Sequence, residues 1–280
     1  MIANSPVCHD PVRPELVEGP VQREPVLRQA QDDWGLLYRE QGLRQAQPER
    51  VCAVAVAFAL TACSAAPPST GFFPLESGHR WTYDVKTEWE NNVVEHEDLV
   101  LTTHGSDSLA EGGAAYRRRS DSGVDYWLRS DDTGIYRVAS KSDLDAEPKP
   151  DAPRRYVLEA PLTAGSSWQA TTTAYLLKRR NEFPREIKHT HPSITMNYTI
   201  EALGDKLQTR AGAFDNCLRV KGAAAVRVYA DPVVGWRDMP LSTTEWYCEG
   251  VGLVRLVREE PAQATFLTGG TLTMELVAWQ

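Results

Sequence analysis

The stretch ITMNYTIEA, residues 194–202, decides the fold class of this chain. Apolar side chains occupy every second position in it, with polar side chains between them: Ile194, Met196, Tyr198, Ile200 and Ala202. Successive side chains of an extended strand point to opposite faces, so this pattern places all the apolar side chains on one face. The stretch therefore predicts a strand with one buried and one solvated face, which is typical of antiparallel sheets.

The same alternation recurs on both sides of this stretch, in residues 81–85 (WTYDV) and 272–278 (LTMELVA). Residues 114–140 contain strand-like segments about eleven residues apart, separated by turns that contain Gly, which is typical of a meander. No segment shows the period of a long amphipathic helix. We expect an all-β domain over residues 71–280. Its predicted architecture is a single curved antiparallel sheet, as a half-barrel or open barrel, with a β-sandwich as the alternative.

One motif occurs twice in this domain. Pro-Leu-x-x-Gly-x-x-Trp is found at 74–81 and again, 87 residues later, at 161–168. Gly permits the positive φ of a tight turn, and the Trp would then begin a strand and close one end of the core. This structural interpretation is favoured, and a duplicated half-domain is the alternative. Residues 142–155, which include EPKPDAP, are expected to form a long surface loop within one domain.

The first 42 residues are excluded from the predicted fold. They contain the near-repeat LRQAQ, at 27–31 and just beyond at 43–47, and the string PVRPELVEGP at 11–20. These strings resemble translated repetitive extragenic palindromic DNA, which implies that residues 1–42 are not part of the native protein. The alternative is a genuine disordered leader, because such a segment cannot bury enough apolar surface to fold.

An apolar run, Val51–Leu60, precedes the tetrapeptide Leu60-Thr61-Ala62-Cys63. The run has ten residues, fewer than the roughly 18–20 that a membrane-spanning helix needs, and suits a signal peptide. The tetrapeptide resembles the lipobox of bacterial lipoproteins. That resemblance implies that residues 43–62 are a signal peptide, cleaved after Ala62, and that Cys63 carries palmitate-type acyl chains. The alternative is a buried hydrophobic helix that ends in Cys.

Residues 63–70 would then be the acylated cysteine and a flexible linker, rich in Ala, Pro and Ser. Two or more acyl chains hold a protein at a bilayer durably. Ser64 stands where Asp is the usual signal for retention in the inner membrane, so the resemblance implies an outer-membrane address facing the periplasm. The seven linker residues could hold the domain up to ~25 Å from the bilayer.

The charge balance argues against nucleic acid as a partner. The chain has a formal net charge of −8, whereas nucleic-acid-binding domains usually carry a basic excess. The expected partners are the membrane, through the N-terminal lipid, and a lipid or envelope-protein ligand.

Two further cysteines, Cys217 and Cys248, remain in the body of the chain. An even pair in an oxidising compartment favours a disulfide. The pair would close a loop of about 31 residues, for which the chain-entropy account gives ~3–4 kcal/mol of stabilisation. The alternative is two buried free thiols.

No catalytic residue, metal site or cofactor is predicted. The sequence contains no G-x-S-x-G, H-E-x-x-H, Walker or dinucleotide-binding motif. His189-Thr190-His191 would place two imidazoles on one face of a strand, but no third ligand lies nearby in sequence. These histidines more readily belong to a basic segment from Lys178 to Lys188. That segment either faces anionic head groups or is a solvated loop.

Two stretches near the end of the chain, AGAFDNCLRV at 211–220 and TEWYCEGVGLVR at 244–255, resemble β-rich bacterial lipoproteins of uncharacterised function. The repeated Pro-Leu-x-x-Gly-x-x-Trp motif belongs to the same pattern, and the resemblance covers residues 72–279. It implies a curved antiparallel sheet similar to the half-barrels of lipoprotein carriers and of their outer-membrane receptor. It implies no catalytic residue.

The expected function is that of a lipid-anchored, non-enzymatic envelope protein that binds a lipid or protein partner. The alternative is a structural or assembly factor that works through its loops and edge strands. An envelope hydrolase is the least favoured hypothesis. An apolar cavity would favour binding of a lipid, and a filled core would favour the assembly role.

Overall fold

The computed structural model describes residues 71–109, 112–181, 183–229, 233–262 and 266–280. The predicted leader (1–42), signal peptide (43–62) and linker (63–70) lie outside these residues. They include Leu60, Thr61, Ala62 and Cys63. The anchor therefore remains a prediction from the sequence.

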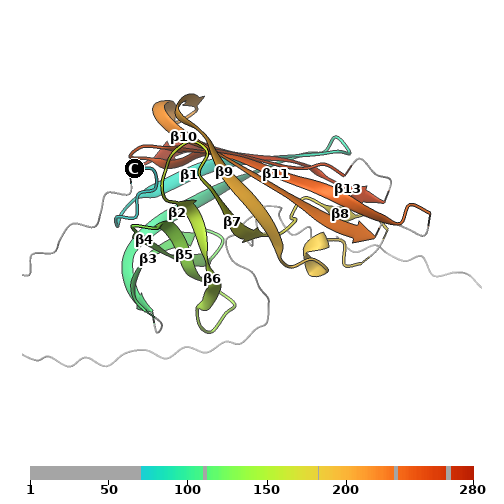
Figure 1. Ribbon diagram of the computed structural model, residues 1–280, viewed down its shortest axis with the longest axis horizontal. Helices are drawn as coiled ribbons and strands as arrows, with labels where there is room; N and C mark the ends of the chain where they lie inside the picture. Colours follow the sequence, from blue (N-terminus) through green and yellow to red (C-terminus); the bar gives the residue numbers. More distant parts are fainter. Residues whose placement is uncertain (1–70, 110–111, 182, 230–232, 263–265) are drawn as a thin grey trace, which may run out of the picture.

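Twelve strands form one antiparallel sheet in the order β6-β5-β4-β3-β2-β1-β14-β12-β11-β10-β9-β7 (Figure 1). A two-stranded sheet of β8 (Lys178–Arg179) and β13 (Leu267–Thr268) lies beside it. The helical segment of the described residues is the 3-10 turn η1, Ile187–His189. The strands of the main sheet are β1 (Arg80–Trp89), β2 (Val94–Leu109), β3 (Gly113–Ser120), β4 (Val124–Asp131), β5 (Gly134–Ser142), β6 (Lys149–Glu159), β7 (Ser167–Thr172), β9 (Ile194–Thr209), β10 (Gly212–Tyr229), β11 (Trp236–Cys248), β12 (Gly252–Glu260) and β14 (Gly270–Trp279).

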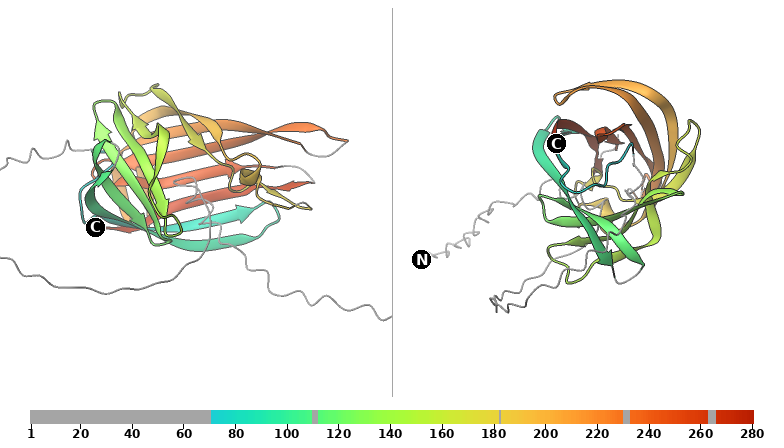
Figure 2. Two further views of the ribbon diagram at one scale, coloured as in Figure 1. Left: turned by 90° about the horizontal axis from the view of Figure 1, so that it is seen from below. Right: turned by 90° about the vertical axis from the view of Figure 1, so that its left-hand side faces the viewer.

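The sheet curves until its two edge strands, β6 and β7, face each other across an open seam (Figure 2). The side chain of Arg155 on β6 bridges this seam, because its Nε donates a hydrogen bond of 2.8 Å to the carbonyl oxygen of Thr171 on β7. The prediction of an all-β domain made of a single curved sheet is confirmed. The sheet forms an open barrel, and the alternative of a β-sandwich does not apply.

The alternation of the 194–202 stretch is realised in β9. Ile194, Met196, Tyr198 and Ile200 are buried on the inner face, and full burial of such a side chain is worth about 1.5–3 kcal/mol. The fifth position, Ala202, is only half-buried. The pairing of β9 with β10 shifts register between the partners of Ile200 and Ala202, so the strict inward alternation ends there.

The prediction of a long surface loop at residues 142–155 is wrong. β6 begins at Lys149 and pairs with β5, so the irregular connection is limited to residues 143–148. A strand containing Pro150 and Pro153 is tolerated here because β6 is an edge strand. Pro153 also lies where the pairing of β6 with β5 shifts register.

The repeated Pro-Leu-x-x-Gly-x-x-Trp motif forms the same turn before β1 and before β7. Gly78 and Gly165 have φ angles of 94° and 91°, a region that favours glycine. The Nε1 of Trp81 donates to the carbonyl oxygen of Val251 at 2.7 Å, and the ring of Trp168 stacks on that of Tyr198. The structural interpretation of the motif fits these contacts. Each copy also stands before the first of six strands in one half of the main sheet.

The open barrel has a proximal end, where the described chain begins at Gly71, and a distal end opposite to it. At the proximal end, the nitrogen of Gly250 donates to the carbonyl oxygen of Gly71, beside the turn between β11 and β12. The distal end is the opposite one, where β1 ends and β11 begins. The thirteen residues of β11 separate the two ends by about 40 Å at ~3.3 Å per residue.

Candidate functional site

The interior of the open barrel is filled by side chains, with Trp81, Tyr83 and Tyr247 among the most deeply buried. A cavity on the inner face, among the described residues, has a volume of about 40 Å³. Pockets for small-molecule ligands usually measure about 300–1,000 Å³. This cavity has space for a few water molecules and not for a lipid chain. Its lining includes Arg155, Tyr156, Tyr198, Glu245, Tyr247 and Arg258.

A buried carboxyl and a phenol lie together in the lining of this cavity. The hydroxyl of Tyr247 donates a hydrogen bond of 2.5 Å to Glu245, and the hydroxyl of Thr243 donates another of 3.2 Å. Burial raises the pKa of Glu245 above its ordinary value, because a charged carboxylate loses its hydration there. The pair has the chemistry of a general acid, but the space beside it is too small for an organic substrate.

A second buried polar group, Arg258 with Glu260, holds a segment of chain inside the barrel. The Nε of Arg258 donates to Glu260 at 2.9 Å, and its Nη2 donates to the carbonyl oxygen of Thr173 at 3.1 Å. Glu260 also accepts from the backbone nitrogens of Tyr175, Leu176 and Leu177. These contacts satisfy the carbonyl of Thr173 and the backbone nitrogens of residues 175–177, which lie outside the strands, so the role of the pair is structural.

The segment that precedes β1 closes the proximal end. Phe73 is buried, and the guanidinium of Arg118 lies 4.4 Å from the centre of its ring and 4.2 Å from that of Trp81. Arg118 also donates to the carbonyl oxygen of Pro74 at 2.5 Å. Burial lowers the pKa of Arg118 to about 10, so the group stays charged at neutral pH and its aromatic partners favour that charge.

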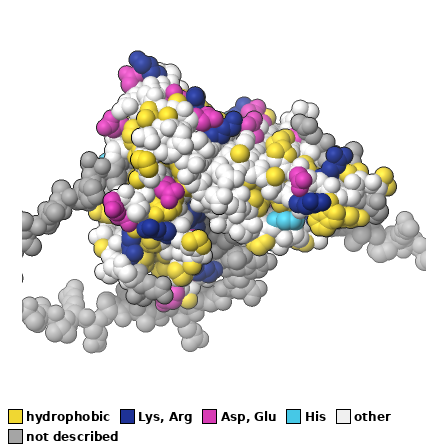
Figure 3. Space-filling model, in the orientation of Figure 1, with side chains coloured by type: hydrophobic (Ala, Val, Ile, Leu, Met, Phe, Trp, Pro, Cys, Tyr) yellow, Lys and Arg dark blue, Asp and Glu magenta, His cyan; other side chains and the backbone are white. Residues whose placement is uncertain are grey.

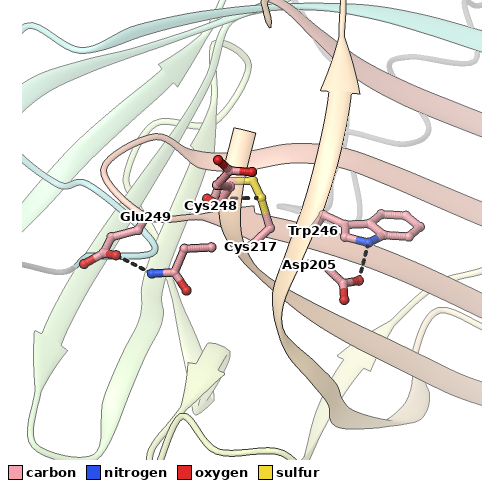
Figure 4. Close-up of a disulfide and its surroundings, with 7 residues drawn as sticks. Asp205, Cys217, Trp246, Cys248 and Glu249 are labelled. Atoms are coloured by element: carbon pink, nitrogen blue, oxygen red, sulfur yellow. Dashed lines mark hydrogen bonds between the residues drawn. A yellow bond between two sulfur atoms is a disulfide. The ribbon is translucent and has the colours of Figure 1, made fainter. Parts of the chain in front are cut away.

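Cys217 and Cys248 are joined by a disulfide, which is the pairing expected from the sequence (Figure 4). The two residues are direct partners across β10 and β11, with Cα atoms 4.0 Å apart. Next to the bond, Asn216 donates a hydrogen bond to Glu249. The Nε1 of Trp246 donates to Asp205 at 3.3 Å. The disulfide therefore ties β10 to β11 at the proximal end, beside the turn between β11 and β12.

His189 and His191 do not lie on one strand, which the disfavoured hypothesis of a metal pair required. His189 ends the 3-10 turn η1, and its Nε2 lies 3.5 Å from Glu186. His191 follows the turn, with its Nδ1 2.9 Å from the hydroxyl of Thr190. The turn forms because residues 187–190 connect the small β8 sheet to β9 and have no neighbouring strand to pair with. Within the described ranges, no group of three His, Cys, Asp or Glu side chains is placed to hold a metal ion.

The basic segment from Lys178 to Lys188 is only partly exposed. Lys188 is buried, and the ammonium of Lys178 lies 4.4 Å from the centre of the Trp89 ring. Burial lowers the pKa of Lys178. The exposed basic side chains of this segment are Arg180 and Arg185, whereas Arg179 is half-buried.

A shallow pocket of about 250 Å³ lies on the outer side of the sheet near the distal end. Its lining includes the carboxylates of Glu88, Glu90 and Glu259. Glu90 accepts hydrogen bonds from the backbone nitrogens of Ala262 and Gly269 at 2.9 and 3.0 Å. Glu259 accepts one from Ser242 at 3.1 Å. These contacts give the carboxylates structural partners, and their charge disfavours an acyl chain.

Exposed apolar side chains gather at the distal end. Ten large hydrophobic side chains are exposed among the residues that the structure describes. Seven of them lie at this end, in or next to the β1–β2 turn, the loop after β8 and the β10–β11 hairpin. Figure 3 shows hydrophobic and basic side chains beside one another at this end, on the right. The seven are Val93, Val94, Phe183, Tyr229, Val233, Val234 and Trp236. This concentration makes the distal end a candidate interaction surface.

Analysis of the sequence alone did not single out these residues. The string VVGW at 233–236 is a weak signal, because it places three apolar side chains around a turn glycine where polar residues are usual. The strands bring this turn next to the basic segment. The Nη1 of Arg179 lies 3.5 Å from the carbonyl oxygen of Tyr229, 50 residues away in sequence.

No helix among the described residues combines the length and the hydropathy needed to cross a bilayer. No protein-family model matches the chain, and no curated protein matches it significantly.

Two solved structures resemble it. One is a candidate exported protein with a YmcC-like fold from Bacteroides fragilis NCTC 9343, with 14% identity and a TM-score of 0.39, covering 75% of this chain and 99% of that chain. The other is a candidate lipoprotein from Parabacteroides distasonis ATCC 8503, with 15% identity and a TM-score of 0.36, covering 75% of this chain and 98% of that chain. At these values the likenesses identify neither a family nor a function.

Proposed function

We propose that this protein is a lipoprotein of the bacterial outer membrane that holds a rigid open barrel in the periplasm and acts as a docking or assembly factor. In this proposal, acyl chains on Cys63 anchor the protein, and the loops of the distal end contact its partner. No catalytic step is assigned to it.

The anchoring part of the proposal is supported by the tetrapeptide at 60–63 and by the position of Gly71. The first described residue lies at the proximal end, where it is hydrogen-bonded to Gly250. A linker of seven residues, Ser64–Thr70, can reach ~25 Å when fully extended. The chain therefore enters the barrel at the end opposite to the exposed apolar loops.

One observation carries the choice between carrier and docking factor. The inner cavity measures about 40 Å³, whereas apolar side chains are exposed on the loops of the distal end. A carrier for a lipid needs an apolar cavity of ligand size. A docking factor needs an exposed contact surface on a stiff support, and the filled barrel provides such a support.

The anchor is tested by labelling with radioactive palmitate in a bacterial host. We expect Cys63→Ser to lose the label and to keep its uncleaved size. Cys52→Ser is the matched control, because Cys52 lies in the apolar run of the same signal peptide and should keep the label. Full labelling of the Cys63→Ser variant would refute the anchor.

The docking role is separated from the carrier role by native mass spectrometry of the mature protein. We expect the mass of the chain with its covalent acyl groups and nothing more. A further lipid that stays bound, stoichiometrically and non-covalently, in the Cys63→Ser variant would show that the barrel carries a ligand and would overturn the docking proposal.

A further inference from the structure

The geometry points to a specific partner for the distal end: we propose that it binds the surface of an anionic lipid bilayer directly. This inference rests on the proposed function and names the partner of the same surface. The contact residues are the distal patch, defined here as Phe183, Tyr229, Val233, Val234 and Trp236.

The distal patch projects into solvent from two different parts of the chain. Val233 is 95% exposed, Phe183 is 83% exposed and Trp236 is 58% exposed. The rings of Tyr229 and Trp236 meet edge to face, with centroids 5.6 Å apart. These two rings meet where β10 ends and β11 begins, at the base of the turn that carries Val233 and Val234.

Basic side chains surround the patch. The guanidinium of Arg185 lies 5.0 Å from the centre of the Phe183 ring, and Arg179 contacts the backbone of Tyr229. Residues 178–191 and 227–238 together contain seven Lys and Arg against four Asp and Glu, in a chain whose net charge is −8. These two segments therefore carry a net positive charge, whereas the β1–β2 turn at the same end carries Glu88, Glu90 and Glu95. The two basic segments are the part of this end that complements an anionic surface.

The combination of these residue types favours a bilayer over a protein partner. Trp and Tyr side chains concentrate at membrane interfaces, where an apolar ring and a polar N–H or O–H are both satisfied. Each basic residue beside an anionic leaflet adds roughly fivefold to the affinity. The patch also consists of projecting loop tips, which can enter a fluid interface without a partner of matching shape. The pocket of about 250 Å³ near this end is lined by carboxylates and offers no apolar groove for a peptide.

The proposed anchor restricts how the barrel can lie. Gly71 and Trp236 stand at opposite ends of a structure about 40 Å long, and the linker reaches only ~25 Å. When the acyl chains and the distal patch occupy the same bilayer, the axis can make an angle of no more than about 40° with the membrane plane. The barrel would then lie along the membrane and not stand upright on it.

The test is hydroxyl-radical footprinting of the full chain carrying Cys63→Ser, so that no acyl chain contributes. The protein is mixed with vesicles of phosphatidylethanolamine and phosphatidylglycerol, or with vesicles of neutral phosphatidylcholine. The readout is local, because the apolar run at 51–60 could hold the whole chain on either vesicle. We expect anionic vesicles to protect Trp236 and Phe183 severalfold from oxidation. Trp279, which is 43% exposed at the proximal end, is the internal control and should keep its labelling.

Arg185→Gln tests the charge. We expect the variant to need a roughly fivefold higher concentration of anionic vesicles for half-protection of Trp236. Its labelling in the absence of lipid should be unchanged. Lys206→Gln, an exposed charge far from the patch, is the matched control. Equal protection of Trp236 by neutral and anionic vesicles would overturn the assignment to an anionic surface.

The same footprint on isolated envelope membranes separates the two proposals. If envelopes protect Trp236 while pure lipid vesicles do not, the partner is a protein, and the bilayer inference fails while the docking role stands. If neither protects Trp236, both proposals fail.

Discussion

Glu260→Gln is the substitution for which the structure gives the sharpest expectation. Glu260 is fully buried on the inner face of β12, and its ion-pair partner Arg258 is 1% exposed. Its two carboxylate oxygens accept four hydrogen bonds, one from Arg258 and three from backbone nitrogens of residues 175–177. Gln has nearly the same shape, so the change removes the charge and one acceptor without opening a cavity.

The magnitude follows from the group that is left behind. The amide NH₂ of Gln would face an N–H donor, and Arg258 would keep its charge without the carboxylate of Glu260. Removing one partner of a buried ion pair typically costs about 3–5 kcal/mol. Domains of this kind are stable by only about 5–15 kcal/mol, so the variant should lose a large part of its free energy of unfolding.

The assay is urea denaturation followed by tryptophan fluorescence. With an m-value of about 2 kcal/mol/M, a loss of 4 kcal/mol, about the middle of the expected range, lowers the midpoint by about 2 M. Glu275→Gln is the matched control. Glu275 on β14 pairs at 2.5 Å with Arg255 on β12, the strand of Glu260, but this pair lies on the outer, partly exposed face of the sheet. That surface pair should contribute no more than about 1 kcal/mol. Equal losses for the two variants would refute the reasoning that Glu260 and its segment form a buried structural lock.

Two further outcomes are expected. Replacing the disulfide by Cys217→Ala with Cys248→Ala should lower the free energy of unfolding by about 3–4 kcal/mol, because the bond closes a loop with a sequence separation of 31 in the unfolded chain. Urea denaturation measures this, and a loss below about 1 kcal/mol would contradict that explanation. For Glu245, burial raises the pKa in the folded state above its ordinary value of 4.5. The protonated carboxyl is therefore compatible with the fold. The contribution of Glu245 to the free energy of unfolding is complete below about pH 4.5 and is lost as the pH rises through the folded-state pKa. Glu245→Gln should match the parent in thermal stability at low pH and exceed it at neutral pH, and a difference that does not change with pH would count against this account.

The sequence by itself determined the fold class, because alternation is a local property. The side chains of the 194–202 stretch must point to opposite faces wherever the strand lies, and burial of one face follows from the hydrophobic effect. It also predicted the pairing of Cys217 with Cys248. The glycines at 78 and 165 marked tight turns for an equally local reason, since only the backbone of the turn decides their φ.

Only the tertiary structure decided which charges are buried and which apolar side chains are exposed. Arg258 and Glu260 read in sequence as part of a charged strand end, yet the inward face of β12 and the segment at 173–177 enclose them. Phe183 and Trp236 read as isolated apolar residues in loops, and the curvature of the sheet brings their loops to one end. Which of these side chains are buried depends on contacts between segments that are 50 or more residues apart in sequence. The curvature of the whole sheet creates these contacts, and no local sequence pattern encodes it.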